Sequence, residues 1–314
     1  MDSKKMLMSC LVVICFASAV QASIVINAPA GVTIDTLFIS TSDQDSILGS
    51  GPYQKGDIVK IDVATATASL YFQGSQHFSA TENVDAISLT GDGKIILSTS
   101  DSAWLPSVGT FKKGDLVLYD PNTGNASMFF HGSDLIYRYS SGCKYYDRQL
   151  DSAILLDDGT IVFSVSGDNT YRLNKLSSGY ISFDKNDLVA YKAGSDPYIY
   201  FDGGAHGITK DIDAAAILPN GDLVFSLASN TSSPISANDE DLILYSILGN
   251  SFSLFLDSYE QLHMACGDED IDALDIIATW SEEHHEDNPV PEPLSCTLFG
   301  LSILGGLTVW RRRK

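Results

Sequence analysis

Aspartates and serines recur at matching positions in four stretches of this 314-residue chain. One aspartate opens an apolar run in each stretch, at Asp85, Asp151, Asp213 and Asp272. A second opens a later run, at Asp57, Asp115, Asp187 and Asp241, with a serine near the end of the intervening run at Ser98, Ser164, Ser226 and either Ser40 or Ser42. The carboxylate and hydroxyl oxygens of these residues are ligands suited to Ca²⁺. They can also accept hydrogen bonds from backbone N–H groups where loops enter strands. A Ca²⁺ site at the first set of aspartates and a structural role are therefore both open.

The remaining polar residues form no recognisable catalytic motif. His77 and His206 share a register, but no two histidines have zinc-ligand spacing on one element, so we expect exposed or capping roles. The nucleophile elbow, the phosphate-binding loop and the dinucleotide fingerprint are all absent. A hydrolase needs one nucleophile beside one base, whereas these residue types repeat in every stretch. We expect the chain not to be an enzyme.

The elements that carry these residues are repeats of four short runs rich in Val, Ile, Phe and Tyr, separated by turn residues. This pattern predicts four β-strands per repeat. Three repeats begin at Asn83, Leu150 and Asp211. The fourth is split, because residues 35–74 supply its second to fourth strands and residues 270–277 supply its first.

A repeat completed by the last strand of the chain is typical of a closed ring. We predict an all-β fold, a four-bladed β-propeller over residues 23–280 closed by its C-terminal strand, with a β-sandwich or solenoid as the alternative. The connections from strand two to three and from four to one are long and lie on the same face, here called the top face. The repeated aspartates and serines gather there, so we expect binding at this face.

The net negative charge of the chain limits the kinds of partner that it can bind. Six of the 19 basic residues lie at the two chain ends, which leaves 13 basic against 38 acidic residues between positions 23 and 289. Such a body repels nucleic acid and anionic lipid and attracts cations. Cys143 and Cys266 are the only cysteines in that body, and one disulfide or two buried free thiols are both open.

Both ends of the chain carry targeting signals. Residues 1–22 have Lys4 and Lys5 before an apolar run and small residues near Ala22, as in a signal peptide. After an acidic linker at 281–289, the C-terminal tail at 290–314 contains Val290, Pro291, Glu292 and Pro293, an apolar segment at 294–310, and Arg311, Arg312, Arg313 and Lys314. That segment is long enough to form a transmembrane helix, and the basic cluster would keep its end cytoplasmic.

This tail resembles the PEP-CTERM sorting signal of Gram-negative bacteria, which an exosortase cleaves. The repeats, with signatures such as Asn83-Val84-Asp85-Ala86, also look like a domain common among predicted PEP-CTERM surface proteins. The resemblance implies export through the Sec translocon, transient anchoring by the C-terminal helix, and then a cell-surface or extracellular location. It suggests a non-enzymatic binding or structural role, with extracellular polysaccharide or surface proteins as partners. The alternative is a secreted propeller hydrolase, lactonase- or phytase-like, acting through acidic top-face residues.

Cleavage near Pro291-Glu292-Pro293 is the first testable expectation. In a host that has an exosortase, mass spectrometry of the mature protein should show both ends removed. Deleting residues 311–314 should impair this processing, because the basic end fixes the tail in the membrane. A mature product that retains Arg311 to Lys314 would contradict the resemblance.

Overall fold

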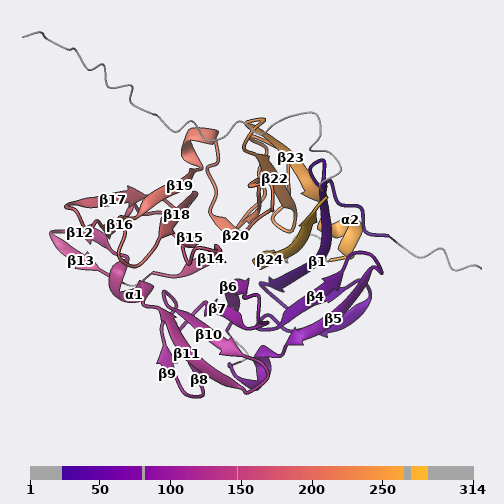
Figure 1. The fold of residues 1–314 in the computed structure, drawn as a ribbon, viewed down its shortest axis with the longest axis horizontal. Coiled ribbons are helices and arrows are strands. Elements are labelled where there is room, and N and C mark those ends of the chain that lie inside the picture. The colour runs from indigo at the N-terminus through magenta and orange to yellow at the C-terminus, as the bar shows by residue number, and fades with distance from the viewer. Residues whose placement is uncertain (1–22, 80–81, 147, 265–269, 282–314) are drawn as a thin grey trace, which may run out of the picture.

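Four antiparallel four-stranded sheets surround a central axis, forming the predicted β-propeller (Figure 1). The computed structural model describes residues 23–79, 82–146, 148–264 and 270–281. The predicted signal peptide, the sorting tail and its apolar segment at 294–310 lie outside the described residues. Within them, no helix has the length and apolar character needed to cross a membrane.

Every blade has the predicted strand content. Blade 1 consists of β24 (Ile271–Trp280), β1 (Val32–Thr41), β4 (Ile58–Asp62) and β5 (Thr67–Phe72). Blade 2 consists of β6 (Val84–Leu89), β7 (Ile95–Thr99), β10 (Leu116–Asp120) and β11 (Asn125–Phe130). Blade 3 consists of β14 (Leu150–Leu155), β15 (Ile161–Val165), β18 (Asp187–Tyr191) and β19 (Tyr198–Asp202). Blade 4 consists of β20 (Ile212–Ile217), β21 (Leu223–Leu227), β22 (Leu242–Ser246) and β23 (Ser251–Leu256).

The last described strand closes the ring, as the split repeat predicts. β24 pairs antiparallel with β1 from Val32 opposite Trp280 to Thr41 opposite Ile271. Beyond the paired strands, the backbone N–H of Ser42 donates to the carbonyl of Asp270 at 3.2 Å. The first blade therefore joins both ends of the described chain.

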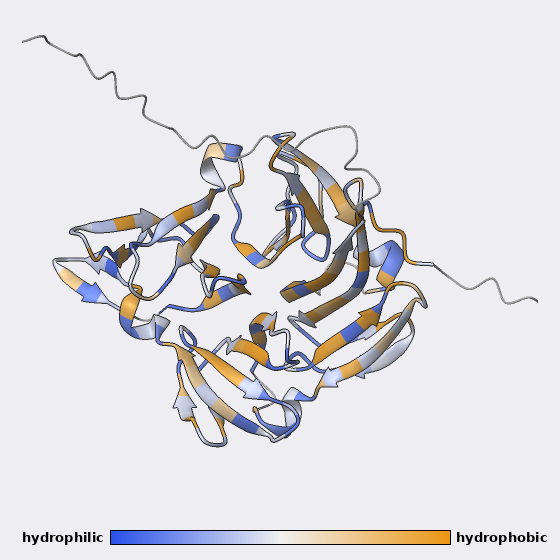
Figure 2. Cartoon of the chain, in the orientation of Figure 1, coloured by the Kyte–Doolittle hydropathy of each residue, from blue (hydrophilic) through white to orange (hydrophobic). Residues whose placement is uncertain are grey.

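The hydrophobic core lies between successive blades rather than in one central mass. Phe38 and Ile58 of blade 1 share a cluster with Val117 of blade 2, and each of the other three blade junctions has a similar cluster. Hydrophobic and hydrophilic residues alternate along many blade strands (Figure 2), as expected of sheets packed face to face. The innermost strands β24, β6, β14 and β20 crowd the axis, where the buried residues Ala86, Ala214 and Ala273 leave room for their neighbours.

The long connections on the top face contain most of the remaining structure. Three strand-two-to-three connections form hairpins: β2 (Asp45–Ile47) with β3 (Ser50–Tyr53), β8 (Ala103–Leu105) with β9 (Gly109–Phe111), and β16 (Tyr171–Asn174) with β17 (Tyr180–Phe183). The strand-four-to-one connections contain η1 (Gly74–Gln76), α1 (Gly132–Leu135), η2 (Gly204–His206) and α2 (Ser258–Leu262). Between blades 2 and 3, α1 is followed by another hairpin, β12 (Arg138–Ser140) with β13 (Cys143–Tyr145).

Cys143 corrects one expectation from the sequence. It begins β13 as a free, exposed thiol and is not buried, because this hairpin projects from the blades instead of packing within them. Cys266 lies outside the described residues.

Closure of the ring through β24 predicts the effect of truncating the chain at its C-terminal end. Ending the chain before Asp270 removes β24 and leaves the backbone of β1 and an apolar blade face without a partner. We expect aggregation or a loss of stability of at least several kcal/mol, by analogy with other losses of core packing. Ending it after Ser281 is the matched control, and a thermal melt should distinguish the two. Equal melting temperatures would contradict closure through β24.

Candidate metal centre

The aspartates before the third strands hold each blade's own backbone together. One carboxylate oxygen of each accepts an N–H from three residues upstream at 2.9–3.0 Å, from Gln54, Lys112, Asp184 and Asn238. The other oxygen accepts an N–H from the turn after the fourth strand at 2.9–3.2 Å, from Gly74, Ser133, Gly203 and Ser258. This fourfold pattern shows that Asp57, Asp115, Asp187 and Asp241, the cap aspartates, have a structural role.

Serines at the ends of the second strands also serve the backbone. The hydroxyl groups of Ser40 and Ser98 donate to the carbonyls of Lys55 and Lys113 at 3.1 and 3.0 Å, so Ser40 is the fourth member of the set. The Ser226 hydroxyl donates to the carbonyl of Ile271 at 2.8 Å. Ser164 instead bonds to the hydroxyl of Ser152 at 2.8 Å.

The first-strand aspartates Asp85, Asp151, Asp213 and Asp272, here called the axial aspartates, behave differently. They lie near the starts of the four innermost strands, and Asp85, Asp151 and Asp272 are only 4%, 2% and 7% exposed. Burial raises the pKa of all four well above the usual range, and repulsion from neighbouring carboxylates raises it further. Asp272, for example, is repelled by each of the other three.

The side chain two positions before each axial aspartate either donates a hydrogen bond to the axial aspartate of the preceding blade or repels it. In two blades this residue is an amide. Asn83 donates from Nδ2 to Oδ2 of Asp272 at 2.6 Å, and Gln149 donates from Nε2 to Oδ2 of Asp85 at 2.6 Å. Half of the axial carboxylates are therefore stabilised by a neutral donor from the next blade.

In the other two blades the same position holds an acid. Asp211 raises the pKa of Asp151, and Asp270 raises that of Asp213. Lys185 compensates Asp211, with 2.7 Å between its Nζ and Oδ1 of Asp211. Among the described residues no ion pair reaches Asp213, Asp270 or Asp272.

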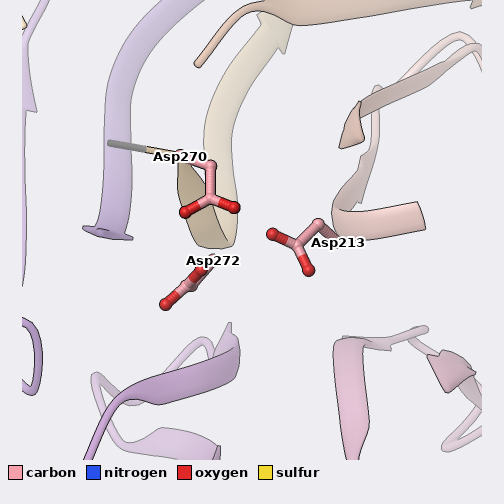
Figure 3. A group of neighbouring side chains, drawn as sticks. All are labelled: Asp213, Asp270 and Asp272. Atoms are coloured by element: carbon pink, nitrogen blue, oxygen red, sulfur yellow. The ribbon is translucent and has the colours of Figure 1, made fainter. Parts of the chain in front are cut away.

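Asp213, Asp270 and Asp272 form the closest group of carboxylates near the axis in the described part of the chain. One carboxylate oxygen from each lies within 4.8 Å of the others. Figure 3 shows the three carboxylates gathered where β20 and β24 begin. Oδ2 of Asp213 is buried and has no hydrogen-bond partner in the described part of the chain.

Asp151 is a second, independent sign of a missing partner. Neither of its carboxylate oxygens makes a hydrogen bond of acceptable geometry with a described residue. The Ser166 hydroxyl is close enough to lower the pKa of Asp151, but burial and repulsion from Asp213 and Asp85 outweigh this effect. A single weak donor such as Ser166 cannot satisfy both oxygens of a buried carboxylate. This carboxylate needs a proton or a cation.

Of the four axial aspartates expected to hold one ion, Asp213 and Asp272 lie together with Asp270, whereas Asp85 and Asp151 are outside this group. Asp270, Asp211, Asn83 and Gln149 were not predicted as site residues. Their shared position two residues before each axial aspartate was the available signal, but its meaning depends on the packing of adjacent blades.

The expected histidine roles are right only in part. His77 is the C-cap of η1, and its backbone N–H donates to the carbonyl of Gly74. Its ring also stacks on Phe72 with centroids 5.2 Å apart, and its Nε2 lies 3.3 Å from the hydroxyl of Tyr119 in blade 2. His206 stacks on Phe201 at 5.1 Å and likewise meets Tyr245 of blade 4. Both side chains therefore join adjacent blades and are not fully exposed. Burial lowers the pKa of His77.

Comparisons with known proteins give only weak similarity to solved structures. No protein-family model and no curated protein matches the chain. A Bacteroides caccae protein of unknown function is similar over 70% of this chain and 72% of its own, with 11% identity and a TM-score of 0.31. For virginiamycin B lyase from Staphylococcus aureus the values are 72%, 89%, 8% and 0.33. These similarities are too weak to carry a functional argument. The strand topology itself defines the class, a four-bladed β-propeller with an acidic axis.

Stability should fall as pH rises when cations are chelated. Burial raises the pKa of Asp275 to about 6 and that of Glu240 to about 7. Each acid thus binds its proton more tightly in the folded chain than in the unfolded chain, so the free energy of unfolding decreases from about pH 4 to pH 7. The axial aspartates act in the same direction. We expect the melting temperature in EDTA to be roughly 5 °C lower at pH 7.5 than at pH 5.

Two variants separate this effect from general charge repulsion. Asp213→Asn, which cannot ionise, should raise the melting temperature at pH 7.5 in EDTA. Asp158→Asn is the surface control: Thr160 and Lys192 lower the pKa of Asp158 to about 2, so its ionised form is already stabilised. A melting temperature that increases between pH 5 and 7.5 in EDTA would overturn this interpretation of the axis.

Proposed function

We propose that this chain is an exported, surface-displayed propeller that binds Ca²⁺ at its axis and has a binding or structural role without catalysis. The observation that carries the proposal is the meeting of Asp213, Asp270 and Asp272 near Asp151, whose buried oxygens lack a hydrogen-bond partner among the described residues. Buried carboxylates this close together destabilise the fold unless they are protonated or neutralised. A divalent cation neutralises them at neutral pH.

The ligand chemistry of the site suits Ca²⁺ better than Mg²⁺. Ca²⁺ takes about six to eight oxygen ligands in flexible geometry, whereas Mg²⁺ retains several waters and is usually bound by only one or two carboxylates. Here three carboxylate oxygens lie within 4.8 Å of one another, and Asp151 is a further carboxylate near the axis.

A binding role is favoured because the top-face hydroxyls are already engaged. Ser40, Ser98 and Ser226 donate to backbone carbonyls, so none of them is held by a base as a nucleophile must be. The cap aspartates are likewise saturated by backbone N–H groups. The hydrolase alternative would require these hydroxyl and carboxylate groups to give up their present hydrogen bonds.

Display at the surface rests on the chain ends. The signal-peptide pattern at 1–22 and the Pro291-Glu292-Pro293 tail support export and exosortase processing. An acidic body is also compatible with extracellular surroundings, where Ca²⁺ sites of millimolar affinity are common.

Calcium should stabilise the purified protein specifically. Binding to the folded state alone adds about 2.7 kcal/mol at a hundredfold excess over the Kd. We expect a rise in melting temperature with CaCl₂ that MgCl₂ and NaCl at matched ionic strength do not reproduce. Isothermal titration calorimetry should show one site per chain.

Variants locate the site. Asp213→Asn and Asp270→Asn should each abolish the calcium-specific rise, whereas Asp158→Asn, on the exposed surface, should retain it. An equal rise with all three salts would show that the acids are only screened, and would reject the metal centre. A calcium effect that survives in both axial variants would place the ion elsewhere.

A further inference from the structure

A second polar feature of the top face is basic rather than acidic. A cavity of about 480 Å³ opens between blades 2 and 3, lined by Lys112, Lys113, Gly114, Ser133, Asp134, Tyr146 and Arg148. Among the described lining residues, three are basic and one, Asp134, is acidic. Such a balance is unusual in a body with 13 basic and 38 acidic residues.

Two lining residues can contact a ligand directly. Lys112 pairs with Asp134 at 3.6 Å, but both side chains are more than 60% exposed, so this pair is weak. Arg148 donates from Nη1 to the hydroxyl of Tyr171 at 3.1 Å, and its guanidinium lies 5.0 Å from the centre of that ring. The Arg148 Nε atom is buried and has no hydrogen-bond partner among the described residues.

Aromatic side chains extend from this cavity across the two neighbouring hairpins. The rings of Tyr146, Tyr137 and Tyr139 form a row in which the outer two are exposed and the central Tyr137 is buried. Each outer ring centroid lies 5.7 Å from that of Tyr137, and the ring planes are inclined by 50° and 76°. The hairpins are held together by paired backbone hydrogen bonds between Tyr137 and Arg172, at 3.1 and 2.7 Å. Arg172 lies 5.0 Å from the ring centre of Tyr139 and 4.3 Å from that of Tyr180. The aromatic row therefore continues from the cavity onto β17.

Stabilisation of the hairpins does not by itself explain this surface. Every cation–π contact found in the described residues involves positions 137–180. Yet Tyr139, Tyr145, Tyr146 and Tyr180 remain between 40% and 47% exposed. Exposed aromatic residues clustered with arginine are characteristic of binding surfaces.

We infer that the cavity and the tyrosine row bind an acidic polysaccharide that carries carboxylate groups. Arg148 and Lys112 pair with a sugar carboxylate in the cavity, which has the volume of a small-molecule site. The exposed tyrosine faces pack against the apolar faces of successive sugar rings, and their hydroxyl groups bond to sugar hydroxyls. A concave cavity continued by exposed tyrosine rings fits an extended sugar chain better than the flat surface of a protein.

This inference does not depend on the proposed calcium site, so its test is done in EDTA. The probe is a trimer of galacturonic acid, titrated calorimetrically into the purified protein. The fully methyl-esterified trimer is the neutral control, and a hexaglutamate peptide is the acidic control without sugar rings. We expect saturable binding of the acidic trimer alone, weakened at least tenfold by raising NaCl from 50 to 500 mM.

Exposed side chains provide variants that should remain folded. Tyr146→Ala and Lys112→Ala should each weaken binding at least fivefold with an unchanged melting temperature, and Arg148→Gln should abolish it. Lys192→Ala, which removes a surface lysine paired with Asp158, is the control and should bind normally. No binding by the wild-type protein, equal binding of hexaglutamate, or unchanged binding by the Tyr146 and Lys112 variants would each overturn the inference.

Discussion

The pairing of β24 with β1 is the constraint on which the rest of the molecule depends. It brings residues more than 200 positions apart into one sheet and closes four blades around a single axis. Closure also assembles the candidate metal centre, because Asp213 belongs to blade 4 whereas Asp270 and Asp272 arrive with the closing strand. An ion held by these three carboxylates would span the junction between blades 4 and 1. Metal binding at this centre would therefore be thermodynamically linked to ring closure.

Two sets of repeated aspartates have opposite surroundings because of their positions in the blade. Each cap aspartate lies where two connections of its own blade meet, so two backbone N–H groups are always available to it. An axial aspartate lies on an innermost strand and faces other blades. Its partner depends on a single side chain from a neighbour, which is an amide for Asp85 and Asp272 and an acid for Asp151 and Asp213. Repetition in sequence therefore does not imply an equal role.

The fold could be predicted from the sequence because apolar runs and turn residues mark each strand locally, and the split repeat reveals closure. The meeting of Asp213 and Asp272 followed from the common register of the axial aspartates. The contributions of Asp270 and Gln149 could not be predicted, because they depend on which neighbouring blade a side chain reaches. For the same reason the contacts of the His77 ring with Phe72 and with Tyr119 of the next blade could not be predicted. The basic cavity could not be predicted because it combines residues from two separate connections.

Charge on the top face is segregated, and this limits how the two proposed sites can work together. Asn83 and Gln149 supply amides to Asp272 and Asp85, and Arg148, which precedes Gln149, lines the basic cavity. The two axial carboxylates that receive no such amide, Asp151 and Asp213, belong to blades 3 and 4. A surface that served only solubility would intersperse both signs. This segregation would instead favour the approach of a polyanion over the tyrosine row. It would favour the approach of a cation over Asp213 and Asp270.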